Sequence, residues 1–335
     1  MIIERILIVG LGSMGKVHLR LARELLPNAN ICVLRHHECK ESLEYANACF
    51  SSLEEALVFA PQVAVIANPS TFHMQVAIPL AQVGAHLLVE KPLSVSSTNV
   101  EKLISTINSK GTVLAIGYNL RFLPSLKLFR DHLKNRELIG KIYSVRCETG
   151  QYLPSWRNNT DYRNGVSARH KLGGGVLLEL SHEIDYIRWI FGEIDWISAV
   201  LVKQSDLEID VEDSAHLILG IKENSENSKF IANINLDFIR HDTTRLCTVI
   251  GEKGSLRWNG ITRVVEHYKV NSKKWEILFK DESQQYDSYR LEWQHFLSCI
   301  NNKAKPLITG EDGFKVIQII EAARLAAETG IKTNV

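Results

Sequence analysis

The chain has 335 residues, and its 39 lysines and arginines nearly balance 38 aspartates and glutamates, which gives a formal charge of +1. This balance argues against a protein that acts mainly by capturing nucleic acid or an anionic membrane. Hydrophobic residues make up 45% and charged residues 23%, as is typical of a globular chain rather than a disordered one. The length predicts two domains of ordinary size.

No apolar run approaches the roughly 20 residues that a transmembrane helix requires, and the first residues lack the layout of a signal peptide. The six cysteines lie far apart without a Cys-x-x-Cys pair, so the sequence indicates neither a zinc site nor a disulfide framework. We therefore expect reduced thiols, no bound metal and a cytoplasmic location.

From residue 1 to about 118, short apolar runs alternate with helical patterns, as in parallel strands joined by crossover helices. The runs are almost continuously apolar, which is typical of strands covered on both faces. We expect strands at 6–9, 31–34, 63–67, 86–89 and 112–116. Helices are expected at 14–26, 52–60, 71–83 and 95–109, the last with Ser94 as its N-cap.

After about residue 140, the pattern changes to longer β-rich runs that alternate in part and are separated by turn-prone stretches. These runs lie at 142–147, 196–202, 215–221, 230–238 and 247–250. No βα alternation continues, so we expect a largely antiparallel open sheet with helices on one face, formed by 175–191, 285–301 and 312–328. The sequence thus predicts an α/β protein with a doubly wound parallel sheet in residues 1–120. A second α/β domain follows in residues 121–335, with its last helix packing back near the first domain.

A glycine pattern follows the first strand, where Gly10, Gly12 and Gly15 form G-x-G-x-x-G before a helical stretch. Such glycines allow a tight turn, a close approach of the backbone to a pyrophosphate, and close packing of helix on strand. The free N–H groups at the helix start, where Ser13 and Met14 lie, then bind the diphosphate. The position of this motif at the start of a βαβ series favours dinucleotide binding over a purely structural turn.

The end of the second strand usually carries an acidic residue that accepts hydrogen bonds from the adenosine ribose. Here that position holds Arg35. Because a guanidinium can bind a 2′-phosphate, we predict NADP as the favoured cofactor, with NAD as the alternative. A solvated basic loop is the other interpretation of this residue.

Polar residues also follow the third, fourth and fifth apolar runs, at the strand ends where open α/β sheets place their ligands. They are Asn68-Pro69 with His73, Glu90-Lys91-Pro92, and Gly117-Tyr118-Asn119-Leu120-Arg121-Phe122. A further polar stretch in the second half runs from Gly173-Gly174-Gly175 through Glu179 and His182 to Asp185.

These motifs closely resemble those of the Gfo/Idh/MocA family, named from glucose-fructose oxidoreductase and inositol dehydrogenase, over nearly the whole chain. The resemblance implies an N-terminal Rossmann domain and a C-terminal α/β domain with an open sheet. It also implies oxidation or reduction of a sugar or cyclitol with a pyridine nucleotide, and homodimers or homotetramers formed through the open sheet. It places in the cofactor site Asn68, Pro69, His73, Glu90, Lys91 and Asn119.

By this resemblance Lys91 is the catalytic lysine, whose strand-end ammonium can polarise the substrate oxygen. His182 is the expected general acid/base, because an imidazole can take the hydroxyl proton near neutral pH. Glu179 and Asp185 lie three residues on either side, so on one helix both would neighbour His182 and could orient the ring or bind a sugar hydroxyl. Family members usually have an Asp four residues before the His, where this chain has Leu178. The alternative is a polar first turn of an apolar helix.

Aromatic and basic residues before the triple glycine predict the substrate pocket. Trp156, Arg157 and Tyr162 combine flat apolar faces with a cation, and Arg163 and Arg169 add positive charge. Such a set suits a sugar that carries a carboxylate or phosphate. Similar elements occur in family members associated with bacterial surface-polysaccharide synthesis. Lys91, Arg121 and His182 are expected to contact the substrate as well.

The sequence therefore predicts an NAD(P)-dependent dehydrogenase or reductase acting on a CH–OH group of a carbohydrate. One alternative is a non-redox nucleotide-binding sensor, although the presence of Lys91 and His182 speaks against it. Another is a lyase that uses tightly bound NAD for a transient oxidation. Neither a nucleic acid nor a membrane is expected as a partner.

Overall fold

The computed structural model describes residues 2–36, 43–157, 160–223 and 229–335. The chain divides into two compact units, the first formed by Met1–Asn119 with Gln285–Ile317 and the second by Leu120–Gln284 with Gln318–Val335. Within the described residues, no helix combines the length and apolar character needed to cross a membrane.

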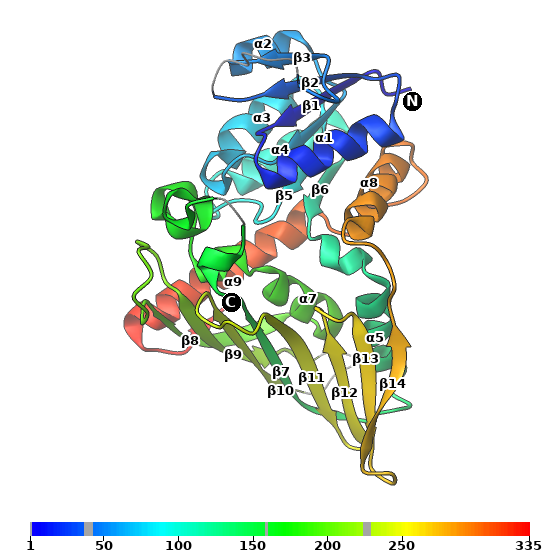
Figure 1. Cartoon of the computed structure of the whole chain (residues 1–335), viewed down its shortest axis with the longest axis vertical. Helices are drawn as coiled ribbons and strands as arrows, with labels where there is room; N and C mark the ends of the chain where they lie inside the picture. The colour runs from blue at the N-terminus through cyan, green and yellow to red at the C-terminus, as the bar shows by residue number, and fades with distance from the viewer. Residues whose placement is uncertain (1, 37–42, 158–159, 224–228) are drawn as a thin grey trace. The chain divides into compact units, whose positions relative to one another are not determined.

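The first unit is built on a six-stranded parallel sheet in the order β3-β2-β1-β4-β5-β6 (Figure 1). Its strands are β1 (Arg5–Val9), β2 (Asn30–Leu34), β3 (Ala48–Phe50), β4 (Val63–Ile66), β5 (His86–Glu90) and β6 (Leu114–Gly117). The five predicted strands are confirmed. The short, half-exposed edge strand β3 was not predicted, because three residues carry too little pattern.

The helices of the first unit are α1 (Ser13–Leu25), α2 (Leu53–Val58), α3 (His73–Gln82), α4 (Val100–Lys110), α8 (Asp287–Ile300) and the start of α9 (Gly310–Thr329). The predicted start of α4 after Ser94 is wrong. The helix begins at Val100, five residues later than expected, behind Asn99, whose φ of 66° is left-handed. The serines before Asn99 favour turns over helix, because their hydroxyls compete for backbone hydrogen bonds.

The expectation that 285–301 covers the second sheet is wrong, because helix α8 belongs to the first unit although it follows the strands of the second unit in the sequence. Its residues Trp293, Phe296 and Ile300 are buried in the same apolar cluster as Leu19 of α1 and Ile6 of β1. Burial of two aromatic rings and an isoleucine contributes several kcal/mol, roughly 1.5 to 3 for each side chain. This packing places the residues around α8 beside the parallel sheet.

The second unit contains a nine-stranded sheet in the order β14-β13-β12-β11-β7-β10-β9-β8-β15. Its strands are β7 (Ile142–Gly150), β8 (Ile194–Val202), β9 (Ser214–Ile221), β10 (Phe230–Asp237), β11 (Thr244–Gly251), β12 (Gly254–Asn259), β13 (Val264–Lys269), β14 (Lys274–Lys280) and β15 (Thr333–Asn334). The β7–β10 pair is parallel and the other pairs are antiparallel. The predicted α/β fold class with a largely antiparallel second sheet is confirmed.

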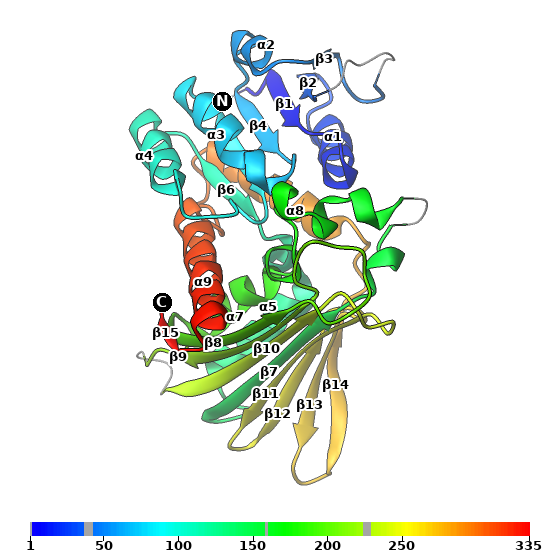
Figure 2. The same cartoon turned by 90° about the vertical axis from the view of Figure 1, so that its left-hand side faces the viewer.

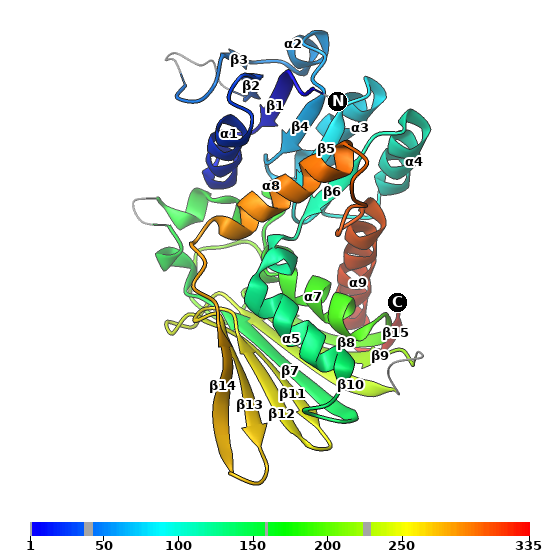
Figure 3. The same ribbon diagram turned by 90° about the vertical axis from the view of Figure 1, so that its right-hand side faces the viewer.

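Helices α5 (Pro124–Asn135) and α7 (His182–Phe191) lie on one face of this sheet (Figures 2 and 3). Within the described residues, no helix lies on the other face in either view. The single helix predicted over 175–191 is wrong, because α6 (Val176–Glu179) ends at Leu180 and α7 starts at His182. Ser181 between them favours a helix boundary rather than a helix interior.

Four cysteines are buried free thiols, as expected: Cys32, Cys147, Cys247 and Cys299. Cys49 is disulfide-bonded, so the expectation of reduced thiols is wrong for that residue. Cys39 lies outside the described residues.

Candidate active site

The glycine-rich turn joins β1 to α1 and leaves its backbone open at the start of the helix. Gly10 has a φ of +85°, and a Cβ there would lie 2.8 Å from the Cα of Asn68, so only glycine fits. A Cβ on Gly15 would collide with the carbonyl oxygen of Gly10. At Gly12, by contrast, a Cβ would meet no atom of the described residues within 4 Å. The space beside Gly12 is therefore open at the N-terminus of α1, where the first N–H groups of the helix have no partner within the helix.

Two further observations show that these residues fit a dinucleotide. Ser13 is exposed and Met14 half-buried at the first turn of α1, where a phosphate would accept from the backbone. The Oδ1 atom of Asn68 is buried without a hydrogen-bond partner among the described residues, and a bound ligand could satisfy it. No group of three or more His, Cys, Asp or Glu in the described chain is arranged to hold a metal ion.

Arg35 and Asn119 are the remaining predicted cofactor residues at strand ends. Arg35 follows β2, is half-buried, and donates its backbone N–H to the carbonyl of Phe50 at 3.1 Å. Asn119 is buried and donates from Nδ2 to the hydroxyl of Ser288 at 2.8 Å. The side chain of Asn119 thus ties the end of β6 to α8.

His73 and Pro69 follow β4, and His73 connects two strand ends. Its Nε2 lies 2.8 Å from the carbonyl oxygen of Asn68, and its Nδ1 lies 3.3 Å from that of Leu93. Burial lowers the pKa of His73, although the hydrogen bonds and Glu90 oppose this shift. Because a neutral imidazole has a single N–H, His73 can donate to only one of these two carbonyls, and the shorter distance favours that of Asn68.

Lys91 is half-buried directly after β5, and its peptide bond to Pro92 is cis. The Oε2 atom of Glu90 accepts the backbone N–H of Lys91 at 3.2 Å. The Oε1 atom of Glu90 lies 2.7 Å from Nε2 of His18. Gly117 pairs with Glu90 across β5 and β6, and a Cβ there would lie 3.1 Å from Oε2, so glycine leaves room for the carboxylate.

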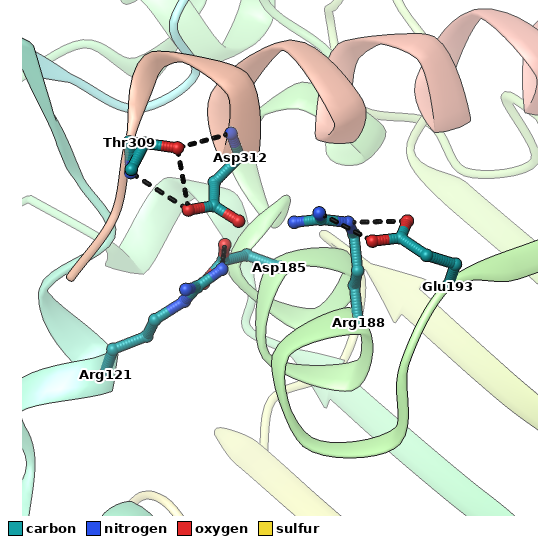
Figure 4. A network of polar contacts seen from close by, with 6 residues as sticks. All are labelled: Arg121, Asp185, Arg188, Glu193, Thr309 and Asp312. Atoms are coloured by element: carbon teal, nitrogen blue, oxygen red, sulfur yellow. Dashed lines mark hydrogen bonds and ion pairs between the residues drawn. The ribbon is translucent and has the colours of Figure 1, made fainter. Parts of the chain in front are cut away.

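In the second unit, His182 is the first residue of α7 and is 8% exposed. The residues around it are held by arginines. Asp185 accepts from Nε of Arg121 at 2.9 Å and from Nη2 at 2.6 Å, and both side chains are buried (Figure 4). Glu183 accepts from Nε of Arg245 at 2.8 Å. Two ion pairs thus fix the first turns of α7 around His182.

The break between α6 and α7 changes how Glu179 relates to His182. Glu179 is the last residue of α6, so the two residues do not share a helix and the expected neighbouring positions on one helix surface are wrong. Asp185 does share α7 with His182, but its carboxylate binds Arg121 in a two-point ion pair. Glu179 is half-buried, whereas Asp185 is 1% exposed.

The triple glycine packs against backbone and against Glu212. A Cβ on Gly174 would collide with the carbonyl oxygen of Val166, and one on Gly175 would collide with the Glu212 carboxylate. That carboxylate accepts the N–H of Leu177 at 3.1 Å and so caps the short helix α6. Burial raises the pKa of Glu212. No sequence signal links Glu212 to the glycines, since 35 residues separate it from Leu177.

Three predicted substrate residues come together in the second unit. Trp156, Arg157 and Tyr162 line one cavity of about 240 Å³. The indole N–H of Trp156 donates to the carbonyl of Gln151 at 3.0 Å, and the Tyr162 hydroxyl accepts the N–H of Glu208 at 3.2 Å. The three residues therefore lie around one hollow, and their role in binding substrate stays a prediction.

Two of the arginines expected to attract an acidic substrate, Arg163 and Arg169, form ion pairs with carboxylates. Arg163 binds Asp161 at 2.8 Å and Glu208 at 3.2 Å, and Arg169 lies 3.8 Å from Asp210. The positive charge of Arg163 and Arg169 is thus balanced locally, whereas the contact of Arg157 with an acidic sugar stays a prediction.

Comparison with known proteins decides the family. Residues 4–118 match the model of the Gfo/Idh/MocA oxidoreductase family NAD-binding Rossmann fold, and residues 131–335 match its C-terminal alpha/beta domain. The chain belongs to the Gfo/Idh/MocA family. It is therefore an oxidoreductase with an NAD-binding domain, and the resemblance drawn from its motifs is confirmed.

Similar proteins cover almost the whole length of this family member. Myo-inositol 2-dehydrogenase of Thermotoga maritima is 25% identical, over 97% of this chain and 96% of its own. A levoglucosan dehydrogenase solved with NADH and levoglucosan superposes with a TM-score of 0.85 at 19% identity, covering 99% of each chain. The WlbA dehydrogenase of Bordetella pertussis, solved with NADH and UDP-GlcNAcA, has a TM-score of 0.81 at 20% identity, over 99% of this chain and 98% of its own.

Proposed function

We propose that this oxidoreductase exchanges a hydride between the nicotinamide of NAD(P) and a CH–OH carbon of a sugar or cyclitol, with Lys91 and His182 as its catalytic residues. The main support is the position of Lys91, which follows a buried strand of the parallel sheet on a turn fixed by Glu90. The compounds named with the relatives above are inositol, levoglucosan and UDP-GlcNAcA. All three contain hydroxylated rings.

In this proposal, the dinucleotide supplies the hydride acceptor or donor, and the chain supplies binding and proton transfer. The turn from Gly10 to Gly15 and Asn68 bind the dinucleotide. The Lys91 ammonium stabilises negative charge on the substrate oxygen, and the His182 imidazole takes or returns the hydroxyl proton. Because Arg121 and Asp185 bind each other, we assign them to holding α7 in place rather than to contacting substrate.

The test is a screen for NADH or NADPH absorbance changes with myo-inositol, levoglucosan, UDP-GlcNAcA and keto sugars. Lys91→Met and His182→Asn should each lower kcat by about 10²-fold or more while the dissociation constant of NADH, followed by fluorescence, stays within twofold. The exposed Lys110→Met in the last turn of α4 is the matched control. Near-normal turnover in both active-site variants would reject the mechanism. Net cofactor turnover also separates this function from a lyase that regenerates its bound NAD.

The finer cofactor preference depends on Arg35. We propose NADP, because the guanidinium follows β2, where a 2′-phosphate would lie, and no carboxylate stands at that position. Arg35→Asp should lower kcat/KM for NADP more than tenfold relative to the wild type. The kcat/KM of the variant for NAD should be equal to or higher than that of the wild type. A clear preference of the wild type for NAD, the cofactor named for the solved relatives, would reject this assignment.

We also propose that the enzyme is a homodimer or homotetramer that associates through the helix-free face of the nine-stranded sheet. Val200, Ile218 and Ile231 are 55%, 46% and 38% exposed there. The register pairs place them on the same face. The face also holds a hollow of about 820 Å³ that Val200 and Ile218 help to line. Exposed apolar side chains beside polar ones, such as His216 and Asn233, suit a surface that a second copy of the chain covers.

A further inference from the structure

The connection from β10 to β11 crosses the carboxyl end of β7, because β7 lies between these two strands in the nine-stranded sheet. Its residues 238–243 therefore meet the segment that leaves β7. The N–H of Gln151 donates to the carbonyl of Asp237 at 3.2 Å, and that of Leu153 donates to the carbonyl of Phe238 at 2.9 Å. These hydrogen bonds hold the two connections together at one edge of the sheet, entirely within the second unit.

Aromatic rings from the two connections pack against each other at this edge. The ring centroids of Tyr152 and His241 lie 4.2 Å apart, with the ring planes inclined by 38°. Trp156 packs edge to face on Phe238 at 5.1 Å, and its indole N–H donates to the carbonyl of Gln151 at 3.0 Å. Phe238 is fully buried, whereas Tyr152 and Trp156 are half-buried. The Trp156 ring thus has a fixed position and remains partly open to solvent.

The same edge of the sheet carries the first turn of α7. The hydroxyl of Thr149, at the carboxyl end of β7, donates to Oε1 of Glu183 at 3.0 Å, and Glu183 directly follows His182. Nε of Arg245, which pairs with Thr149 across β7 and β11, donates to the same oxygen at 2.8 Å. The proposed acid/base and the aromatic rings are therefore anchored to the same end of β7, where a parallel pair of strands ends.

The cavity of about 240 Å³ adjoins these connections, because Leu153 and Trp156 line it, with Tyr162 as a further aromatic wall. Its polar lining comes from Arg157, Thr160, Asp161, Asn164 and Ser167. The first four of these are exposed, so a ligand can enter. The volume lies below the roughly 300–1,000 Å³ of a pocket that holds a whole drug-sized ligand, so it suits a single ring. Aromatic faces beside hydroxyl, amide and guanidinium groups suit a sugar ring or a planar base.

This cavity is separate from the surroundings of His182. Its lining residues come from the described part of 153–167, and no residue of α7 is among them. One sugar ring therefore cannot both react at His182 and pack on the Trp156 side chain. A ring in the cavity must belong to another part of the substrate, joined to the reacting sugar.

We infer that the substrate is a sugar joined to a second ring, and that Trp156 and Tyr162 determine the preference for this extended form over a single-ring sugar or cyclitol. The reacting sugar lies at His182, and the second ring lies in the cavity against the two aromatic walls. This inference rests on the proposed function, because it places only the non-reacting part of that substrate. Binding energy from such a remote part also accelerates the reaction, since it helps to orient the reacting carbon.

The first experiment measures binding without turnover. Isothermal titration calorimetry of the enzyme saturated with reduced cofactor gives the dissociation constants of three matched pairs: cellobiose and glucose, para-nitrophenyl glucoside and glucose, and UDP-GlcNAc and GlcNAc. The pairs distinguish a sugar, an aryl group and a nucleotide as the source of the second ring. At least one extended member should bind about tenfold more tightly than its single-ring partner, because stacking and burial of the second ring add to its affinity. Equal dissociation constants within all three pairs would overturn the inference.

Two substitutions then assign this gain in affinity to the cavity. Trp156→Ala should remove most of the gain, while the dissociation constants of the single-ring partner and of the cofactor stay within twofold, and Trp156→Phe should restore part of it. Asn164→Trp adds bulk to an exposed lining residue and should weaken binding of the extended member alone. Tyr143→Ala, near the amino end of β7 and 54% exposed, is the control. A gain that survives both Trp156→Ala and Asn164→Trp means that the second ring lies elsewhere.

The second experiment compares kcat/KM for the same compounds and for myo-inositol and levoglucosan. The extended sugar that binds most tightly should have the highest kcat/KM, and Trp156→Ala should lower it toward that of the single-ring partner. A single-ring compound with an equal or higher kcat/KM than every extended sugar would reject the second-ring subsite and leave the proposed function standing. A gain in affinity that Trp156→Ala removes, without cofactor turnover by any sugar, would reject the proposed function and leave the subsite standing.

Discussion

At the scale of single residues, the Arg121–Asp185 pair gives a direct stability prediction. Both side chains are at most 3% exposed. Asp185→Asn removes one charge and leaves the other buried without compensation, so we expect a loss of about 3–5 kcal/mol in the free energy of unfolding. Urea denaturation followed by circular dichroism measures it.

The control for this prediction lies at the end of the same helix. Glu193 also forms a two-point pair with an arginine, Arg188, but its side chain is 50% exposed (Figure 4). Glu193→Gln should therefore cost about 0–1 kcal/mol. The double substitution Arg121→Met with Asp185→Leu should recover much of the loss, because no unpaired charge remains. Equal losses in Asp185→Asn and Glu193→Gln would contradict the buried-pair argument.

Glu292 gives a prediction about pH at the same scale. Its pKa is raised in the folded state, so unfolding releases its proton at pH values between the ordinary carboxyl value near 4.5 and the raised pKa. The folded state therefore loses stability as the pH rises from about 4.5 toward the raised pKa. Glu292→Gln removes this dependence on pH. The free energy of unfolding of the variant should exceed that of the wild type only slightly near pH 4.5, and the difference should grow by up to about 1.4 kcal/mol per pH unit. Thermal melting across pH checks this, with the exposed Glu101→Gln as control. A gain independent of pH would show that Glu292 is ionised when folded.

At the scale of elements, the glycine before α6 carries a measurable constraint. Gly175 has a φ of +106°, and a Cβ there would collide with the Glu212 carboxylate. Gly175→Ala should lower the free energy of unfolding by about 1–3 kcal/mol through backbone strain alone. Displacing the Glu212 carboxylate should lower it further. Gly111→Ala after α4 is the matched control, because its φ is +64° and a Cβ there would meet no described atom within 4 Å. Denaturation midpoints that fall equally in both variants would show that the Glu212 contact has no cost.

Elements with a regular pattern were predictable, and contacts between distant residues were not. The buried strands β1, β4 and β5 follow from continuous apolar runs, and Lys91 follows from its place after one of them. Ordinary helical periodicity in 285–301 gave the position of α8 but not the sheet on which it packs. Nothing local revealed that Arg245 pairs with Glu183, because 62 residues separate them. The break at Leu180 was missed because the apolar spacing continues across it.

At the scale of the whole molecule, the near-equal numbers of basic and acidic residues are accompanied by local ion pairs. Arg163 and Arg169 looked like an anion site in the sequence, yet carboxylates bind both in the structure. Arg121, expected to bind substrate, is likewise paired with Asp185. The residue-level interpretation of positive charge therefore needed the positions of the acidic partners. Those partners come from segments remote in sequence, such as Asp210, which also accepts the N–H of His170.

The last prediction concerns assembly through the helix-free face of the nine-stranded sheet. Ile218 in β9 is 46% exposed beside Val200 and Ile231, and a stable interface would bury more than about 1,000 Å² in total. Ile218→Glu would place a charge in that apolar contact, so we expect the assembly to dissociate to monomers in sedimentation velocity at micromolar concentration. Val58→Glu, in α2 of the first unit and 86% exposed, should leave the assembly intact. A wild-type monomer, or an Ile218→Glu assembly as stable as the wild type, would reject this face as the interface. Because the two substitutions add the same charge, a difference between them is due to the surface rather than to net charge.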